Sequence, residues 1–344
     1  MKGSVTASGD WDGRRVAARL VDGQLDDLIL DPPDDTPLPG AIYRAICDRP
    51  MKGQGGITLR LSDTQRGFLR QAKGLRPGQP LLVQVVSFAE PGKAVPVTTR
   101  VLFKSRFAIA TPGAPGINVS RQIKDDDRRD ALLLLAHEHT PEGAGLILRS
   151  RVADAADDLI AEDIARVLSI SAQVMADEGT EAELLLEGPD AHTLAWRDWS
   201  GSQVVADGPT ALKDHEIDGW IEAMQQPRVD LSGGAYAFIE PTRALVAIDV
   251  NTGGDTSPAA GLKANLAMVR ALPRALRCRG LGGQITIDFA PLAKRDRRTV
   301  ESALRAAFRN DQIETALVGW TPLGHFELQR KRERAPVIWP SARD

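Results

Sequence analysis

Residues 235–251 read AYAFIEPTRALVAIDVN and predict a β-hairpin. Two β-rich runs flank Glu240-Pro241-Thr242-Arg243, where a proline suits the second position of a type I turn. The second run ends at Asp249 and Asn251. Because residues i and i+2 of a strand share a face, we expect these two side chains to project together. The stretch therefore predicts a strand end that carries an acid and an amide.

A second apolar run carries another acid at its end. Residues 282–289, GGQITIDF, place Asp288 out of phase with Ile285 and Ile287. Carboxylates at the ends of two short buried strands, with an amide beside one of them, suit a hard cation that takes oxygen ligands and works on phosphate. The alternative is that each aspartate is a turn or cap residue, which is the commoner role of Asp at a strand end.

Helical patterns separate these strands. One helix is expected around LKANLAMVRALPRALRCR (262–279), a second over 297–310, and a short strand follows in ETALVGW (314–320). Strands that alternate with helices predict an α/β layer.

The sequence motifs around Asp249 and Asp288 point to one family. It contains, in order, AIDVNTGG (247–254), Asn265-Leu266, LRCRGLGGQITIDF (276–289) and LGHFELQRKR (323–332). In order and approximate spacing these motifs resemble the catalytic core of the ribonuclease E/G family of bacterial endoribonucleases. The resemblance covers most of the chain and is strongest from Gly233 to Arg332.

This resemblance implies an α/β fold of several subdomains. A ribonuclease-H-like subdomain is expected from residues 1–36 and 180–228. An OB-type RNA-binding β-barrel is inserted over 37–100, and a 5′-end sensor region with a packing helix covers 101–179. A deoxyribonuclease-I-like α/β catalytic subdomain follows over 229–335.

Local patterns support parts of this division. Asp22-Gly23 between two β-like runs is a hairpin signal. Residues 40–100 contain short strands with Gly and Pro turns, which is typical of a small β-barrel. Residues 155–178 carry apolar side chains at helical spacing with acids in the first turn, and they predict a packing helix.

Several residues are candidate RNA contacts. Phe68 would be a stacking platform for a base, with a core position in a strand as the alternative. Arg149 and Ser150, in GLILRS, resemble the family's sensor for the monophosphorylated RNA end, and a surface ion pair is the alternative for Arg149. The other candidates are basic residues: Lys93, Arg121, Lys294 and Arg330.

Composition limits the class of protein. The 344 residues are 42% hydrophobic and 26% charged, as in an ordinary soluble globular protein of about two domains. A net charge of -3 argues against a uniformly basic coat, but basic clusters at 294–298 and 330–334 would attract an RNA backbone. No membrane span or signal peptide is recognisable, so we expect a cytoplasmic location. Cys47 and Cys278 form no CxxC motif, so no zinc site is predicted.

The resemblance also implies an activity. The expected function is a magnesium-dependent endoribonuclease of RNA processing or decay that cleaves single-stranded RNA and leaves 5′-phosphate and 3′-hydroxyl ends. Asp249 and Asp288 would hold Mg²⁺, with Mn²⁺ as a substitute, and Asn251 would support them. The rival hypotheses are a catalytically weak or inactive RNA-binding protein of the same architecture, and a metal phosphoesterase for small molecules.

Some positions depart from the family pattern. Gln122 replaces a second arginine of the sensor, Ile57 replaces an aromatic residue of the barrel, and TGGDTSPAAG (252–261) is short and nearly neutral. The family's paired-cysteine zinc link is not found before the terminal WPSARD (339–344). We therefore expect a monomer or weak homodimer rather than a zinc-linked tetramer.

Overall fold

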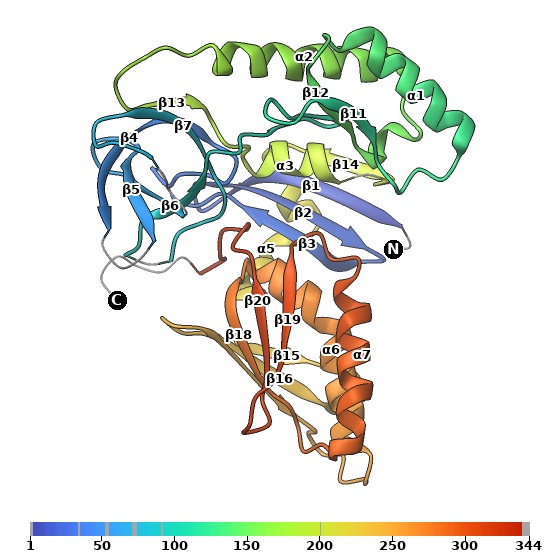
Figure 1. Cartoon of the computed structure of the whole chain (residues 1–344). Coiled ribbons are helices and arrows are strands. Elements are labelled where there is room, and N and C mark those ends of the chain that lie inside the picture. Colours follow the sequence, from blue (N-terminus) through green and yellow to red (C-terminus); the bar gives the residue numbers. More distant parts are fainter. Residues whose placement is uncertain are drawn as a thin grey trace. The chain divides into compact units, whose positions relative to one another are not determined.

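The computed structural model describes residues 3–33, 35–51, 55–70, 74–90, 92–199 and 201–338. The terminal WPSARD lies outside this part of the chain. The chain folds into two compact units, the first from residues 1–36 and 201–344 and the second from residues 37–200 (Figure 1). Within the described residues, no helix combines the length and the apolar character that crossing a membrane requires.

The first unit contains an N-terminal sheet in the order β14-β1-β2-β3. Its strands are β1 (Ser4–Trp11), β2 (Arg14–Val21), β3 (Gln24–Leu30) and the parallel partner of β1, β14 (Val204–Asp207). The hairpin expected at Asp22-Gly23 is present, with φ angles of 50° and 75°, as a type I′ turn requires. A second Asp-Gly turn, at Asp12-Gly13, joins β1 to β2. Helices α4 (Ala211–Asp214) and α5 (Ile217–Gln225) contribute to the core of this sheet.

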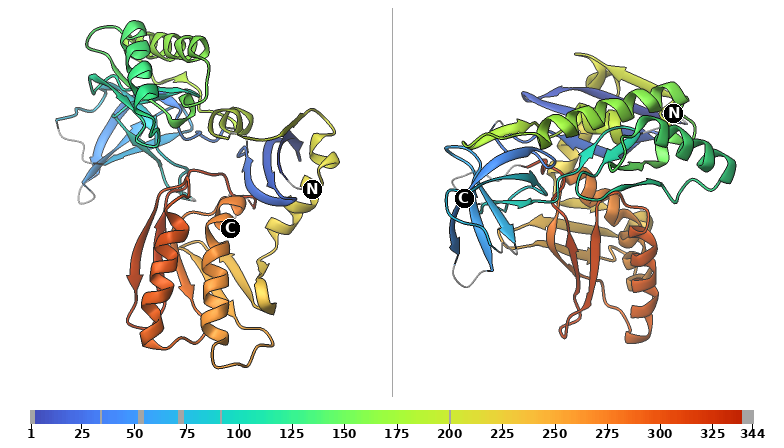
Figure 2. Two further views of the ribbon diagram at one scale, coloured as in Figure 1. Left: turned by 90° about the vertical axis from the view of Figure 1, so that its right-hand side faces the viewer. Right: turned by 45° about the horizontal axis from the view of Figure 1, so that its top comes forward.

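A second sheet in the same unit has six strands in the order β15-β16-β17-β18-β20-β19. Their bounds are β15 (Arg228–Asp230), β16 (Tyr236–Pro241), β17 (Val246–Asn251), β18 (Gly283–Asp288), β19 (Thr315–Trp320) and β20 (Phe326–Arg330). Helix α6 (Ala260–Arg279) connects the parallel strands β17 and β18, and α7 (Arg297–Phe308) connects β18 to β19. The two helices lie side by side against the sheet (Figures 1 and 2). Short 3-10 turns occur at η2 (Ser232–Gly234) and η3 (Lys294–Asp296).

Alternation along the central strands separates a core face from an open face. Ile248, Ile287 and Phe326 are at most 2% exposed and pack with the apolar side chains of α6 and α7. The residues between them point away from the helices because the side chains of a strand alternate with period two. The α/β layer expected from the sequence is confirmed, and its open face carries the candidate acids.

The hairpin turns later than the sequence predicted. Pro241 is the last residue of β16 and pairs with Val246, so the connection is Thr242–Leu245 rather than residues 240–243. The Thr242 amide donates to the Leu245 carbonyl at 2.8 Å, and the Leu245 amide donates to Thr242 Oγ1 at 3.1 Å. The threonine side chain therefore closes the turn that proline was expected to form.

The second unit contains a closed β-barrel of five strands. They are β4 (Ile42–Met51), β5 (Gly56–Arg60), β6 (Arg66–Arg70), β8 (Val95–Thr98) and β7 (Pro80–Val85), and pairing of β7 with β4 closes the ring. The barrel expected in residues 37–100 is confirmed, and it is consistent with an OB-like subdomain. Strand β13 (Glu183–Leu186) pairs with β4 outside the ring.

A four-stranded sheet and two long helices complete the second unit. The sheet has the order β11-β12-β10-β9, with β9 (Phe103–Lys104), β10 (Ala108–Ala110), β11 (Gly116–Val119) and β12 (Gly145–Leu148). Helix α2 (Asp157–Met175) confirms the packing helix expected in 155–178. Helix α1 (Asp126–His139), the 3-10 turn η1 (Ser150–Val152) and α3 (Ala191–Asp198) were not anticipated.

The structure divides residues 180–228, which the sequence grouped with residues 1–36. Residues 201–228 lie in the first unit, and residues 180–200 lie in the second. Arg44 on β4 holds the latter segment, because its Nη1 donates to the Glu181 carbonyl at 2.8 Å and its Nη2 bonds Glu183 Oε2 at 2.8 Å. Sheet pairing and this ion pair therefore fix residues 181–186 to the barrel.

Candidate active site

Two aspartates from separate stretches are partners across neighbouring strands. In the parallel β17–β18 ladder Asp249 pairs with Asp288, and both are exposed on the face that α6 and α7 leave open. Adjacent strands lie about 4.8 Å apart, so the two side chains start from neighbouring points. The sheet register therefore brings together the two acids that the sequence singled out.

Asn251 lies on the same face as Asp249. Its Nδ2 donates to Asp249 Oδ2 at 2.8 Å. This hydrogen bond orients the carboxylate and occupies one of its oxygens, while Asp249 Oδ1 stays available to another partner. The shared face expected from the i, i+2 spacing is present.

A buried asparagine holds the chain just after Asp288. Asn265 of α6 is fully buried, and its amide donates to the Ala290 carbonyl and accepts from the Ala290 N–H, both at 2.9 Å. The two bonds satisfy both polar groups of the side chain and fix the end of β18 against α6. The position of Asp288 therefore depends on a residue from the connecting helix.

His325 is a neighbour of the acids that sequence reasoning missed. Its Nε2 lies 3.8 Å from Asp288 Oδ1, which makes an ion pair only when the imidazole is protonated. It precedes β20, where Glu327 pairs with Thr286 on the open face. The sequence does contain a pattern that indicates this position, because His325 and Glu327 alternate with the apolar Phe326 and Leu328 and so share one face of a strand.

The donor set fits a hydrated hard cation. Asp249 and Asp288 offer carboxylate oxygens side by side on an exposed surface, and Asn251 offers an amide. Within the described residues, no group of three or more His, Cys, Asp or Glu side chains is placed to enclose a metal ion. Mg²⁺ is commonly held by one or two carboxylates, with water and phosphate oxygens as the other ligands. This open pair of acids suits that mode of binding.

The two cysteines are buried within the fold. Cys47 and Cys278 are each 2% exposed. Burial raises the pKa of the Cys278 thiol to about 12, which keeps it protonated at neutral pH. Neither residue offers a reactive thiolate near the acids.

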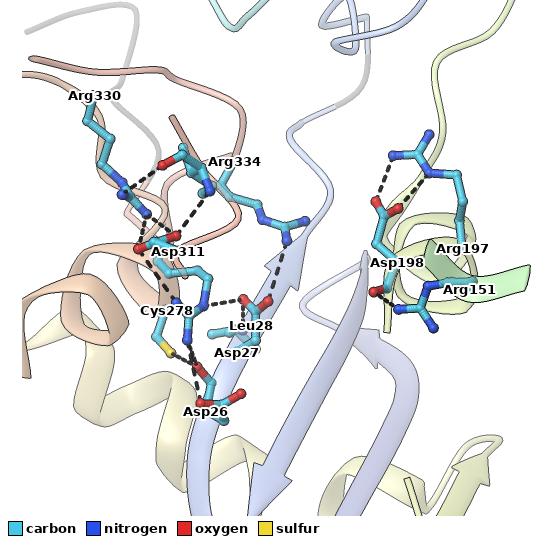
Figure 3. Close-up of polar contacts among 12 residues, drawn as sticks. Asp26, Asp27, Leu28, Arg151, Arg197, Asp198, Cys278, Asp311, Arg330 and Arg334 are labelled. Atoms are coloured by element: carbon cyan, nitrogen blue, oxygen red, sulfur yellow. Dashed lines mark hydrogen bonds and ion pairs between the residues drawn. The ribbon is translucent and has the colours of Figure 1, made fainter. Parts of the chain in front are cut away.

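Arg330 requires a correction as an RNA-binding candidate. It is 1% exposed and bonds Thr315 Oγ1 at 2.7 Å. It also lies 3.3 Å from Asp311 Oδ2 (Figure 3). The burial of Arg330 follows from its position in β20, where it is in phase with the buried Phe326 and Leu328. A guanidinium inside the fold cannot contact RNA. Lys294, by contrast, is exposed in η3, six residues after Asp288 in the chain.

In the second unit the sensor candidates lie at the end of β12. Arg149 Nη2 lies 2.6 Å from Asp198 Oδ1, and Arg197 Nη2 lies 2.7 Å from Asp198 Oδ2. The contacts of Asp198 with Arg197 and Arg151 are drawn in Figure 3. Thus the ion pair that was the alternative for Arg149 is present. Ser150, which begins η1, is partly exposed, and Arg121 is exposed in the turn before α1.

Asp198 makes a testable contribution to acid stability. Burial raises its pKa, but the hydrogen bonds and charges of Arg197 and Arg149 outweigh burial, so the pKa falls to about 2. Because the folded pKa lies below the unfolded one, the carboxylate stabilises the fold above about pH 4, by roughly 2 kcal/mol, and this is lost as the pH falls toward 2. Asp198→Asn should lower the free energy of unfolding by about that amount at pH 7 and show a weaker acid dependence. Urea unfolding at pH 7 and pH 3 tests this, and parallel curves for the two proteins would contradict it.

The barrel candidates lie on its outer surface. Phe68 in β6 is partly exposed between the buried Gly67 and Leu69, so it points away from the barrel interior. Its ring covers Gly56, where an added Cβ would lie 2.5 Å from Phe68 Cζ. Ile57, which stands at an expected aromatic position, is 1% exposed and belongs to the barrel core. Lys93 is exposed and ion-paired with Glu90.

Comparison with known proteins identifies a family model and individual proteins that this chain resembles. The model of the ribonuclease E/G family matches residues 103–207 and 202–333. Ribonuclease E of Nostoc sp. is 30% identical over 352 aligned positions, which cover 86% of this chain and 51% of that protein. Ribonuclease G of Salmonella typhimurium is 28% identical over 311 positions, covering 76% of this chain and 62% of that protein. The chain thus spans about half to three fifths of the length of these curated relatives. It belongs to the ribonuclease E/G family.

Proposed function

We propose that this protein is an endoribonuclease that cleaves single-stranded RNA in RNA processing or decay. The observation that carries the proposal is the pairing of Asp249 with Asp288 on an open sheet face, in a chain of the ribonuclease E/G family. Relatives named ribonuclease E and ribonuclease G support the same class of reaction.

The proposed chemistry assigns a role to each polar residue. Asp249 and Asp288 hold Mg²⁺, which when bound polarises the scissile phosphate and lowers the pKa of a water. Asn251 keeps the Asp249 carboxylate in its orientation through their 2.8 Å hydrogen bond. Lys294 is exposed in the segment that follows Asp288 and attracts the RNA backbone. The products proposed are a 5′-phosphate and a 3′-hydroxyl end.

The finer fold assignments belong to the same proposal. We assign β1–β3 and β14 to a ribonuclease-H-like subdomain and the six-stranded sheet with α6 and α7 to a deoxyribonuclease-I-like subdomain. The closed barrel then acts as an OB-like surface for single-stranded RNA. Arg149 and Ser150 read a 5′-monophosphate only when the phosphate displaces Asp198 from the arginine.

One assay tests the proposed function. Internally labelled single-stranded RNA with a 5′-monophosphate, and the same RNA with a 5′-hydroxyl, is incubated with the full chain with Mg²⁺ or with EDTA. Internal cuts that require Mg²⁺ support the proposal. RNA binding without cuts would overturn it in favour of a non-catalytic RNA-binding protein. Equal rates on the two RNAs would remove the proposed role of Arg149 and Ser150 alone.

The barrel gives a separate prediction. Phe68→Ala should weaken binding of single-stranded RNA by about 1–3 kcal/mol, because stacking of a base on an aromatic ring is worth that much. Fluorescence anisotropy with labelled RNA in EDTA measures the affinity. The control is the conservative variant Phe68→Tyr, which keeps the aromatic ring and should bind RNA normally. Phe88→Ala would not serve as the control, because Phe88 is only 7% exposed. Equal affinity of the Ala and Tyr variants would show that Phe68 does not stack on RNA.

A further inference from the structure

Basic residues are concentrated on the two helices that cover the six-stranded sheet. Helix α6 carries five basic residues and no acid, although the whole chain has a net charge of -3. Helix α7 carries three arginines, and Glu301 is its one acid. The basic residues are Lys263, Arg270, Arg274, Arg277 and Arg279 in α6 and Arg297, Arg298 and Arg305 in α7.

A groove runs between these helices. It has a volume of about 520 Å³. Helix α6 contributes three arginines and three apolar residues to its lining, and α7 contributes three alanines: Arg270, Arg274, Arg277, Leu266, Val269 and Pro273, and Ala303, Ala306 and Ala307. A second hollow of about 360 Å³ shares Arg270 and extends to Lys263. The helices lie side by side along this line (Figure 2). The small alanines of α7 leave the arginine edge accessible.

Two of the groove arginines have no acidic partner. Arg277 is compensated by Asp27 at 3.4 Å and by Asp311 at 3.7 Å. No acid in the described part of the chain forms an ion pair with Arg270 or Arg274, and both side chains are exposed. They lie one turn apart on α6, so they present their charges on the same side of the helix. The groove therefore offers a pair of uncompensated guanidinium groups.

The chemistry of the surface selects a polyanion. An amphipathic acidic peptide would need large apolar anchors in the groove, and neither helix contributes an exposed large hydrophobic side chain among the described residues. The groove is lined by no aromatic residue, so it cannot stack bases. Guanidinium groups bind phosphates through paired charge-assisted hydrogen bonds. These properties suit a phosphodiester backbone contacted without regard to sequence.

We propose that the α6–α7 groove binds the phosphate backbone of RNA as a second contact surface, on the opposite side of the sheet from Asp249 and Asp288. The inference rests on the proposed function in taking RNA as the ligand. If the proposal is right, RNA long enough to reach both faces of the sheet binds more tightly than RNA that contacts only the face carrying Asp249 and Asp288. The contact contributes affinity and salt dependence, and it takes no part in bond cleavage.

The experiment compares Arg270→Ala/Arg274→Ala with the control Arg305→Ala. Arg305 lies in the same helical layer, but its charge is already compensated by Glu301 at 2.6 Å. Anisotropy of labelled single-stranded RNA of about 40 nucleotides, in EDTA, is measured across a series of salt concentrations. The double variant should bind about tenfold more weakly at low salt, because two charge-assisted surface contacts are lost and each contributes about threefold to the affinity. The slope of log K against log salt should fall by about 1.4, at 0.7 per lost phosphate contact.

Each outcome decides the proposal. A reduced slope in the double variant with an unchanged control supports it, provided that the two variants unfold at the same temperature as the parent. An unchanged slope, or an equal loss in the control, overturns it. Binding of a labelled acidic peptide with the same arginine dependence, while RNA binding is unaffected, would also overturn it. Cleavage of an oligonucleotide too short to reach the groove should be normal in the double variant, so failure of this inference is separable from failure of the proposed function.

Discussion

Replacing Asp249 by Asn is expected to reduce magnesium-dependent RNA cleavage by about a thousandfold or more, and Asp288→Asn should have the same effect. Each substitution removes one of the two negative charges that the register of β17 and β18 places side by side. Loss of metal-assisted charge stabilisation costs several kcal/mol in the transition state, and each 1.4 kcal/mol is about tenfold in rate. Both residues are exposed, so the fold should tolerate the change.

The control for this prediction is Glu240→Gln. Glu240 is an exposed acid of β16 that pairs with Ala247, so it lies on the same sheet face but without a carboxylate partner. The rate of cleavage is measured at saturating Mg²⁺, with the unfolding temperature of each variant as a check on structure. Near-normal cleavage by Asp249→Asn or Asp288→Asn would remove the proposed mechanism. A comparable loss in Glu240→Gln would show that the acids act only through the general charge of the face.

Strand periodicity was sufficient to predict that Asp249 and Asn251 share one face of a strand. The i, i+2 spacing of Asp249 and Asn251 is a property of a single strand and needs no knowledge of its neighbours. The register of Asp249 with Asp288 depends on the whole of α6 and on the Asn265 bonds to Ala290. No local pattern specifies that register, so the sequence placed the acids on two strands without showing that they face each other.

Individual residues show the physical reasons why the sequence alone misjudged some of the candidate RNA contacts. Arg330 was taken for an RNA contact because it lies in a basic run, yet its phase with Phe326 and Leu328 carries it into the interior. A charged side chain in the interior position of a strand is exceptional unless acids accompany it, and those acids come from distant segments. Similarly, Arg149 meets Asp198, which lies 49 residues away in the chain. Charge pairing at such separations is visible only in the folded protein.

The acids that accompany Arg330 belong to a buried network of alternating charge. Arg334 contacts Asp27 at 3.5 Å, Asp27 contacts Arg277 at 3.4 Å, and Arg277 contacts Asp311 at 3.7 Å. Asp311 in turn lies 3.3 Å from Arg330, with both side chains 0% exposed. Figure 3 shows Asp27, Asp311, Arg330 and Arg334 of this cluster. It connects β3 of the N-terminal sheet with α6 and β20, so the support of the candidate site includes the start of the chain.

Asp311→Asn is expected to destabilise the first unit by about 3–5 kcal/mol, because it removes the acid that compensates the buried Arg330, whereas Arg277 keeps Asp27. Burial already lowers the pKa of Arg330, and Asp311 is the charge that opposes this shift. The matched control is Asp230→Asn. Its side chain is 80% exposed and pairs with Arg228 at 2.9 Å, and such surface pairs contribute about 0–1 kcal/mol.

The measurement is urea unfolding, with hydrogen exchange of the β20 amides to identify which unit opens. If the Asp311 variant loses less than about 1 kcal/mol, the network is not a determinant of stability and the cations are solvated by some other route. If it loses the larger amount, exchange should accelerate in β20 and in β3 together, since the network joins these strands through Arg277. In that case variants at the network also reduce RNA cleavage, by releasing the strands that hold Asp249 and Asp288 rather than by touching the reacting groups.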